Sequence, residues 1–122
     1  MIIAKNNTHY LFVCHIGRMR SLTAYVVATT EFHLRADYCG TEEAKFIGYS
    51  NVVSIQHMGW ADHIIVFGID NLERLYDLYP RISQKITLWD IPDEYGALDP
   101  VLIALCRLQI TVLLYGKEGQ FP

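Results

Sequence analysis

Short runs of large apolar side chains mark four candidate strands along the chain. Tyr10–Val13 form one such run, which ends at Cys14, and residues 62–68 contain four large apolar residues before a glycine. Unbroken apolar runs of this kind are typical of strands buried on both faces of a parallel sheet. Leu34–Tyr38 and Lys85–Trp89 are the other two candidates.

Segments with the three- and four-residue spacing of amphipathic helices separate these strands. The spacing predicts helices over Ser21–His33 and Asp70–Tyr79, and a last helix from about Leu98–Pro100 to 115–116, where proline suits the first turn. The less regular candidates are a helix start at Thr41-Glu42-Glu43-Ala44 and a helical or irregular stretch at Asn51–Met58. Alternating strands and helices predict an α/β fold with a parallel sheet, whose ligands bind at the carboxyl ends of the strands.

Length and composition restrict the classes to which this protein can belong. With 122 residues, 52% of them apolar and 19% charged, we expect one compact domain over 1–122, with a flexible tail at about 117–122. A net charge of −3 gives no reason to expect a nucleic-acid partner. No apolar run approaches the roughly 20 residues of a membrane span, and the N-terminus lacks a signal-peptide core. Three widely spaced cysteines without a C-x-x-C motif indicate neither a zinc site nor a disulfide framework, so we expect a cytoplasmic protein.

The segment that joins the first strand to the first helix carries the candidate chemistry. Cys14 ends the strand, five residues follow, and Arg20 and Ser21 open the helix. The first N–H groups of a helix lack internal partners and carry the positive end of its dipole, which suits an oxyanion such as phosphate. A loop of this length can direct its own N–H groups at the same anion, while the Arg20 guanidinium binds two of its oxygens. Such donors favour the thiolate form of a cysteine, so Cys14 is a candidate nucleophile that forms a phosphocysteine, with Ser21 as a further donor.

This segment resembles the low-molecular-weight protein tyrosine phosphatases, which carry C-x5-R-[ST] just after the first strand. Cys14, Arg20 and Ser21 match that motif. Further similar segments are Arg35–Thr41, where the family has a strand ending S-A-G-T, Trp60–Val66, where it has A-D-x-I-x-V, and Ile91–Gly96, where it has the acid loop I-P-D-P-Y. The pairing of C-x5-R-S with D-I-P-D-x-Y-x-x-x-D-P is similar to a short bacterial branch of predicted protein tyrosine phosphatases.

The resemblance covers about residues 8–115 and implies both a fold and an activity. The implied fold is a four-stranded parallel sheet in the order 2-1-3-4, with helices on both faces in three layers. The implied activity is phosphomonoester hydrolysis without metal or cofactor, acting on a phosphotyrosine protein or a small aryl phosphate and releasing inorganic phosphate. The implied assembly is a monomer or a weak dimer.

The resemblance also implies roles for individual residues. Cys14 is the expected nucleophile, Arg20 the phosphate clamp and Asp93 the general acid, with Asp90 as the rival for the acid role. Tyr95 would line the cleft and stack on an aryl phosphate. The residues implied to bind phosphate are His15, Ile16, Gly17, Arg18, Met19, Arg20 and Ser21.

The chain departs from the family pattern at three places. Ile16 and Gly17 stand where the family has glycine and then asparagine, Met19 stands where many relatives have a second cysteine, and Glu94 replaces the proline after the acid. The asparagine braces the loop in the family, so we expect reduced activity to originate at Ile16 and Gly17. Glu94 adds a negative charge that would repel acidic substrates.

Three other functions fit parts of the pattern. The altered loop and Glu94 favour a phosphate- or phosphoprotein-binding module with weak catalysis. An arsenate reductase on the same scaffold needs further cysteines to relay a disulfide, and residues 62–93 supply none. A sugar-transport phosphocarrier also has a phosphorylated cysteine, but its loop lacks the terminal arginine.

Four other residues with reactive side chains receive a structural interpretation. Cys39 and Cys106 lie in apolar contexts and are predicted to be small buried residues. His57 and His63 are six residues apart across a Gly-Trp break, which is a poor spacing for a metal pair, so we interpret them as structural or surface residues.

Overall fold

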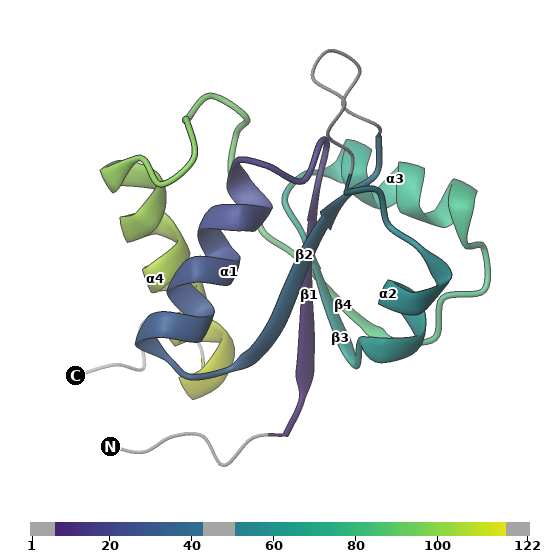
Figure 1. Ribbon diagram of the computed structural model, residues 1–122, viewed down its shortest axis with the longest axis horizontal. Helices are drawn as coiled ribbons and strands as arrows, with labels where there is room; N and C mark the ends of the chain where they lie inside the picture. The colour runs from purple at the N-terminus through teal and green to yellow at the C-terminus, as the bar shows by residue number, and fades with distance from the viewer. Residues whose placement is uncertain (1–6, 43–50, 117–122) are drawn as a thin grey trace.

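The computed structural model describes residues 7–42 and 51–116. Strands and helices alternate along the chain as β1 (His9–Cys14), α1 (Arg20–Glu31), β2 (Arg35–Gly40), α2 (Ile55–Trp60), β3 (His63–Val66), α3 (Ile69–Leu78), β4 (Lys85–Leu88) and α4 (Pro100–Tyr115). Figure 1 shows three layers, with α1 and α4 on one face of the sheet and α2 and α3 on the other. No helix within these described ranges is long and apolar enough to cross a membrane.

The sheet has four parallel strands in the order β2-β1-β3-β4, which confirms the predicted topology. In the register, Val13 of β1 lies between Cys39 of β2 and Val66 of β3. Because all four strands run the same way, their carboxyl ends meet along one edge of the sheet. Cys14 therefore ends beside Gly40, at the edge where ligands of such folds bind.

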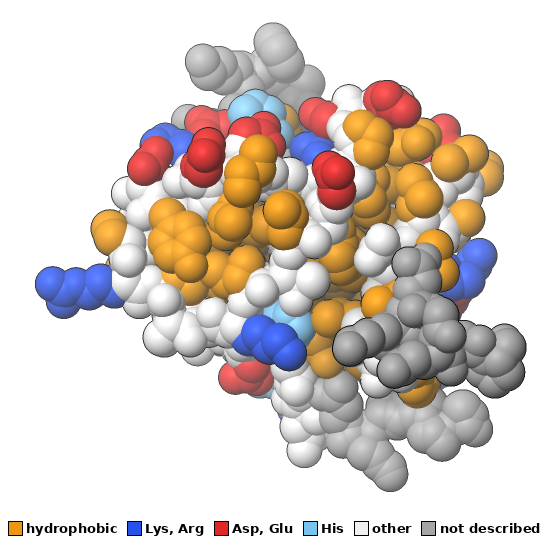
Figure 2. All heavy atoms as spheres, turned by 180° about the vertical axis from the view of Figure 1, so that it is seen from behind, with side chains coloured by type: hydrophobic (Ala, Val, Ile, Leu, Met, Phe, Trp, Pro, Cys, Tyr) orange, Lys and Arg blue, Asp and Glu red, His pale blue; other side chains and the backbone are white. Residues whose placement is uncertain are grey.

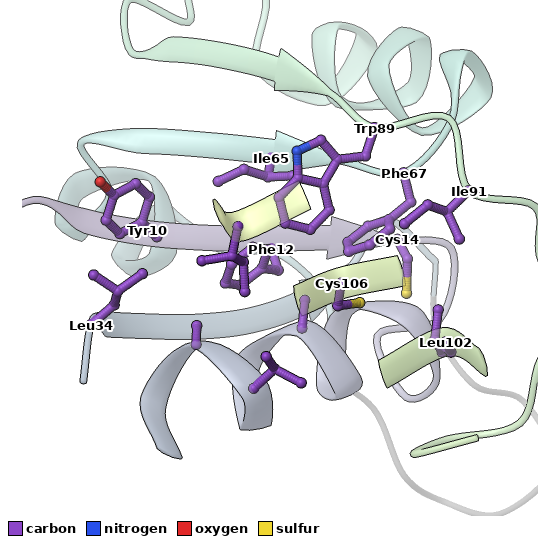
Figure 3. Packing of buried hydrophobic residues seen from close by; sticks show 14 residues of the cluster. Tyr10, Phe12, Cys14, Leu34, Ile65, Phe67, Trp89, Ile91, Leu102 and Cys106 are labelled. Carbon is purple, nitrogen blue, oxygen red and sulfur yellow. The ribbon is translucent and has the colours of Figure 1, made fainter. Parts of the chain in front are cut away.

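Side chains of β1 alternate between two hydrophobic clusters, one on each face of the sheet. Tyr10, Phe12 and Cys14 point toward α1 and α4, whereas Leu11 and Val13 point toward α2 and α3. On the α1 side, three aromatic rings pack together with centroid distances of 5.5 Å for Phe12–Trp89, 6.4 Å for Phe12–Phe67 and 5.4 Å for Phe67–Trp89 (Figure 3). Burial on both faces explains the unbroken apolar runs of β1 and β3.

The helix boundaries differ from the predicted ones in ways that the local geometry explains. The first helix ends at Glu31 instead of His33, because His33 adopts a left-handed φ of 55° and the Leu34 N–H binds the Ala28 carbonyl at 3.0 Å. In the ambiguous stretch 51–58, Ser54 begins α2 through a capping box with His57. The predicted helix start at 41–44 and the predicted flexible tail fall largely outside the described residues.

His57 and His63 have structural partners in the fold. His57 belongs to that capping box, and His63 Nε2 lies 2.7 Å from Thr87 Oγ1 in the sheet. Burial lowers the pKa of His63 to about 4, with a smaller effect from Lys85, so its imidazole is neutral at pH 7. The residues described contain no cluster of three or more side chains that could hold a metal ion.

Asp99 is the N-cap of the last helix and directly precedes Pro100, the first residue of α4. Its Oδ1 accepts the Val101 N–H at 2.8 Å, and Pro100 occupies the first helical turn, where a missing N–H costs nothing. We expect Asp99→Ala to lower the free energy of unfolding by about 1 kcal/mol, as loss of an N-cap does. Urea unfolding followed by circular dichroism measures the change. Asp99→Ser keeps the cap, so an equal loss in both variants would contradict this role.

Candidate functional site

The loop between β1 and α1 forms a small cradle at the carboxyl edge of the sheet. We call residues 14–21 the cysteine loop. The cradle is a cavity of about 40 Å³, lined by Cys14, His15, Ile16, Arg18, Met19, Arg20 and Asp93. The Cys14 thiol donates to Ser21 Oγ at 3.1 Å, and both residues are buried. The structure therefore brings together the predicted nucleophile, the predicted clamp and the predicted acid.

The cysteine loop packs backbone to backbone against the end of β2. Gly17 has a left-handed φ of 82°, and a Cβ there would lie 2.6 Å from the Cys39 carbonyl carbon and from Gly40 N. The N–H of Thr41 binds the Cys14 carbonyl at 3.0 Å, and the N–H of Glu42 binds the His15 carbonyl at 2.8 Å. Glycine at position 17 thus permits a conformation that most side chains disfavour, and the chain after β2 holds the loop carbonyls. The bracing expected from an asparagine comes here from backbone contacts.

Four backbone N–H groups of the cysteine loop are candidate donors to an anion. Among the described residues, no backbone carbonyl accepts from the N–H of His15, Ile16, Gly17 or Met19. The same loop leads into the N-terminus of α1, where Met19 provides no side-chain cap. Orphan N–H groups at a helix N-terminus attract negative charge, so this cradle is a candidate site for an oxyanion.

Arg20 lies buried beneath the cradle and is held in place by two carbonyl groups. Its Nη1 donates to the Phe67 carbonyl at 3.3 Å and to the Ile91 carbonyl at 2.9 Å, and the guanidinium carbon lies 5.8 Å from the Phe67 ring centroid. Its Nε is buried and has no hydrogen-bond partner. A buried donor without a partner is costly, and a phosphate oxygen in the cradle would satisfy it.

Asp93 reaches the cradle from a separate segment, residues 90–97, which we call the aspartate loop. Its Oδ1 lies 3.7 Å from Arg20 Nε, and its side chain is 58% exposed. A second cavity, of about 400 Å³, adjoins the cradle and is lined by both Asp90 and Asp93. Only Asp93 also lines the small cradle beside Cys14. Of the two rival carboxylates, Asp93 is therefore the one placed to exchange a proton with a group bound at Cys14.

Four hydrogen bonds that the sequence did not suggest connect the aspartate loop and the residue after it to the cysteine loop, to α1 and to the chain after β3. The Ile91 carbonyl accepts from Arg20, while the Ile91 N–H binds the Phe67 carbonyl at 3.3 Å. Beyond the loop, the Leu98 N–H donates to Thr23 Oγ1 at 2.9 Å, and that hydroxyl donates to the Met19 carbonyl at 2.7 Å. Thr23 lies three residues after Arg20 on α1 and is completely buried. Helical spacing could have predicted that Thr23 shares the buried face of Arg20, but not which groups it contacts.

Tyr95 lies away from both cavities. It lines neither the cradle nor the adjoining cavity, and its ring packs against the cluster on the α1 side of the sheet. Its pKa is raised by desolvation and by the neighbouring Glu94, so the phenol is neutral at pH 7. Stacking of Tyr95 on an aryl phosphate stays a prediction.

The other two cysteines are buried, as predicted, and their chemistry differs from that of a nucleophile. Cys39 and Cys106 are fully buried and free. Burial raises the pKa of Cys106 to about 12, and burial, followed by Asp37 and Cys14, raises the pKa of Cys39. Both side chains are therefore neutral thiols at pH 7, which makes them poor candidates for relaying a disulfide.

Solved structures with a similar fold include proteins named as tyrosine phosphatases and one named as an arginine phosphatase. A protein tyrosine phosphatase from Entamoeba histolytica, solved as a product-state mimic, is 25% identical with a TM-score of 0.62, over 91% of this chain and 98% of that one. A low molecular weight protein tyrosine phosphatase from Streptococcus pyogenes is 17% identical with a TM-score of 0.64, over 88% and 93%. The arginine phosphatase YwlE of Bacillus subtilis, with a phosphorylated active site serine, is 14% identical with a TM-score of 0.63, over 87% and 96%.

No protein-family model matches the sequence, and a search of curated proteins finds no significant match. The likeness therefore lies in the fold. The chain has the fold of the low-molecular-weight protein tyrosine phosphatases, as the resemblance implied.

Proposed function

We propose that this protein hydrolyses phosphomonoesters through a phosphocysteine on Cys14, and that its substrates are phosphotyrosine proteins or small aryl phosphates. The observation that carries the proposal is the buried Nε of Arg20, which has no hydrogen-bond partner, lies 3.7 Å from Asp93 Oδ1, and belongs to a residue that lines the cradle together with Cys14. A dianionic phosphoryl group fits that donor, the free loop N–H groups and the α1 N-terminus together. The proposal treats the chain as a single phosphatase domain.

The proposed reaction has two steps that balance in atoms and charge. The Cys14 thiolate attacks phosphorus, the bond from phosphorus to the ester oxygen breaks, and Asp93 in its protonated form gives its proton to the leaving oxygen. Asp93 then takes a proton from water, whose oxygen attacks the phosphocysteine. The S–P bond breaks, and the products are inorganic phosphate and the Cys14 thiolate. Arg20 and the loop N–H groups bind the three non-bridging oxygens in both steps.

Known proteins with this fold support the choice of substrate class. The solved structures include proteins named as tyrosine phosphatases and one named as an arginine phosphatase. A direct assay compares the release of phosphate from phosphotyrosine, phosphoserine and phosphoarginine peptides in the presence of a metal chelator. Hydrolysis of the phosphotyrosine peptide supports the proposal. Tight phosphate binding with negligible turnover on all three would instead favour a binding module.

The general acid can be identified through its dependence on the leaving group. We expect Asp93→Asn to lower kcat/KM, which reports the step that expels the leaving group, by about 10²- to 10⁴-fold on phenyl phosphate, because phenolate is a basic leaving group that needs a proton. The loss should be much smaller on 4-nitrophenyl phosphate, whose leaving group is stable as an anion. Asp90→Asn is the matched control and should leave both rates nearly unchanged. The opposite pattern, with a large loss only in Asp90→Asn, would assign the acid role to Asp90.

A further inference from the structure

The last helix carries apolar residues on its outer side as well as on its buried side. Leu102, Cys106 and Ile110 of α4 are fully buried against the sheet and α1. A second set faces away from them, and we call this set the outer stripe: Val101, Leu105, Leu108, Val112 and Tyr115. Figure 2 shows hydrophobic side chains gathered over the part of the molecule where α4 lies. A surface helix of a monomer normally shows a polar outer face, so the outer stripe calls for a partner.

Much of the outer stripe is open to solvent in the single chain. Val101, Leu108 and Tyr115 are each between 46% and 54% exposed, and Leu98, which precedes the helix, is 46% exposed. Leu105 and Val112 are half-buried, and Leu105 also touches the cluster on the α1 side. Three large side chains about half exposed on one face of a single helix make an exposed apolar surface.

The spacing of the outer stripe is that of a seam between two helices. Its members follow one another at intervals of four, three, four and three residues, which is the spacing of the a and d positions of a coiled coil. α4 has 16 residues and is therefore about 24 Å long, enough for about four layers of contacts. This spacing fits another helix better than it fits a flat surface.

Charge is nearly absent from this face. Arg107 is the one charged residue of α4, and its Nε and Nη2 bind the two carboxylate oxygens of Glu31 on α1 at 2.6 and 2.8 Å. That pair lowers the pKa of Glu31 and holds the guanidinium toward α1. Ala104 and Thr111, which flank the outer stripe on the helix, are small and uncharged. Two copies of this face can therefore approach without like charges meeting.

We propose that the occupant of this face is a second copy of the chain, with the two α4 helices packed antiparallel about a two-fold axis near Leu108. A parallel pair would place the carboxylates at the N-terminal end of α4, such as Asp99 and those of the aspartate loop, beside their own copies. The antiparallel pair separates them and sets each helix N-terminus beside the C-terminus of the other, which is the favourable arrangement of the two dipoles. Leu108 is the middle member of the stretch 101–115, so it meets its own copy, whereas Val101 meets Tyr115.

The self-association can be measured directly by sedimentation equilibrium on the full chain. A seam of one helix from each copy is a small interface, so we expect a dissociation constant on the order of 10 μM. Leu108→Asp places two carboxylates together at the axis and should raise this constant by at least about 100-fold. The matched control is Ile55→Asp, at a residue 74% exposed on α2, which should leave it unchanged. Circular dichroism and phosphatase activity show whether each variant is folded.

Cysteine cross-linking tests the antiparallel arrangement and does not depend on a destabilising charge. Under a mild oxidant, Leu108→Cys should form a covalent dimer rapidly, whereas Val101→Cys and the unmodified chain should not. Efficient cross-linking of Val101→Cys would overturn the antiparallel arrangement. A wild-type chain that stays monomeric at concentrations up to about 500 μM would overturn the dimer altogether, since that concentration is far above the dissociation constant expected for this interface.

Discussion

Replacing Cys14 by serine is expected to abolish turnover while leaving phosphate binding intact. A serine hydroxyl is a far weaker nucleophile than a thiolate, and the covalent route has no substitute in the cradle, so we expect kcat to fall by about 10⁴-fold or more. Arg20, its carbonyl partners and the loop N–H groups remain in place. Steady-state hydrolysis of 4-nitrophenyl phosphate measures the loss, and calorimetric titration with inorganic phosphate measures the binding.

Cys106→Ala is the matched control for this variant. Cys106 is buried between the sheet, α1 and α4 and touches neither cavity. The control loses some stability but should retain its activity at 25 °C. Full activity in Cys14→Ser would exclude the cysteine mechanism. Loss of both turnover and phosphate binding in Cys14→Ser would mean that serine disrupts the loop itself.

The second large effect is expected at Gly40, which belongs to β2 and not to the cysteine loop. A Cβ at Gly40 would collide with the Ile16 backbone and would lie 2.6 Å from Gly17 N. Since both contacts are to backbone atoms, no side chain can rotate away. We expect Gly40→Ala to displace the loop, to lower kcat/KM by at least about 100-fold and to cost about 1 to 3 kcal/mol of stability.

Gly59→Ala provides the comparison for Gly40→Ala. A Cβ at Gly59 meets nothing within 4 Å, and the residue lies in α2, far from the carboxyl edge of the sheet. This variant should keep full activity and gain a little stability from the better helix propensity of alanine. If Gly40→Ala behaves like Gly59→Ala in the same activity and urea-unfolding measurements, the close packing of the cysteine loop on β2 does not limit catalysis.

Local patterns in the sequence predicted most of the fold. The apolar runs of β1 and β3, buried on both faces, and Pro100 and Asp99 at the start of α4 are signals that act within a few residues. Local patterns could not predict the strand order, because periodicity does not say which strands are neighbours. The correct order came from the resemblance of the cysteine loop and the aspartate loop to a known family. The end of α1 was placed two residues too late, since a left-handed histidine carries no strong signal.

The site was predictable where it depends on side chains close in sequence. Cys14, Arg20 and Ser21 lie within one loop, and their spacing alone placed them together. The carbonyls of Phe67 and Ile91 that hold Arg20 could not be predicted, because every residue has a carbonyl and only the tertiary fold selects two of them. The bracing of the loop by Gly40 was hidden for the same reason. The role of each residue in turnover stays a prediction.

The contacts of Arg20 also bear on how the protein folds. Its Nη1 joins α1 to carbonyls 47 and 71 residues further along the chain. Contacts between residues this far apart in sequence require large loops of chain to close. A chain that lacks β3, or the segment that follows β4, still has the cysteine and the arginine close in sequence but lacks the two carbonyls that hold the guanidinium. The anion site proposed for this protein therefore depends on the complete sheet, and a fragment that ends before residue 91 is expected to lose it.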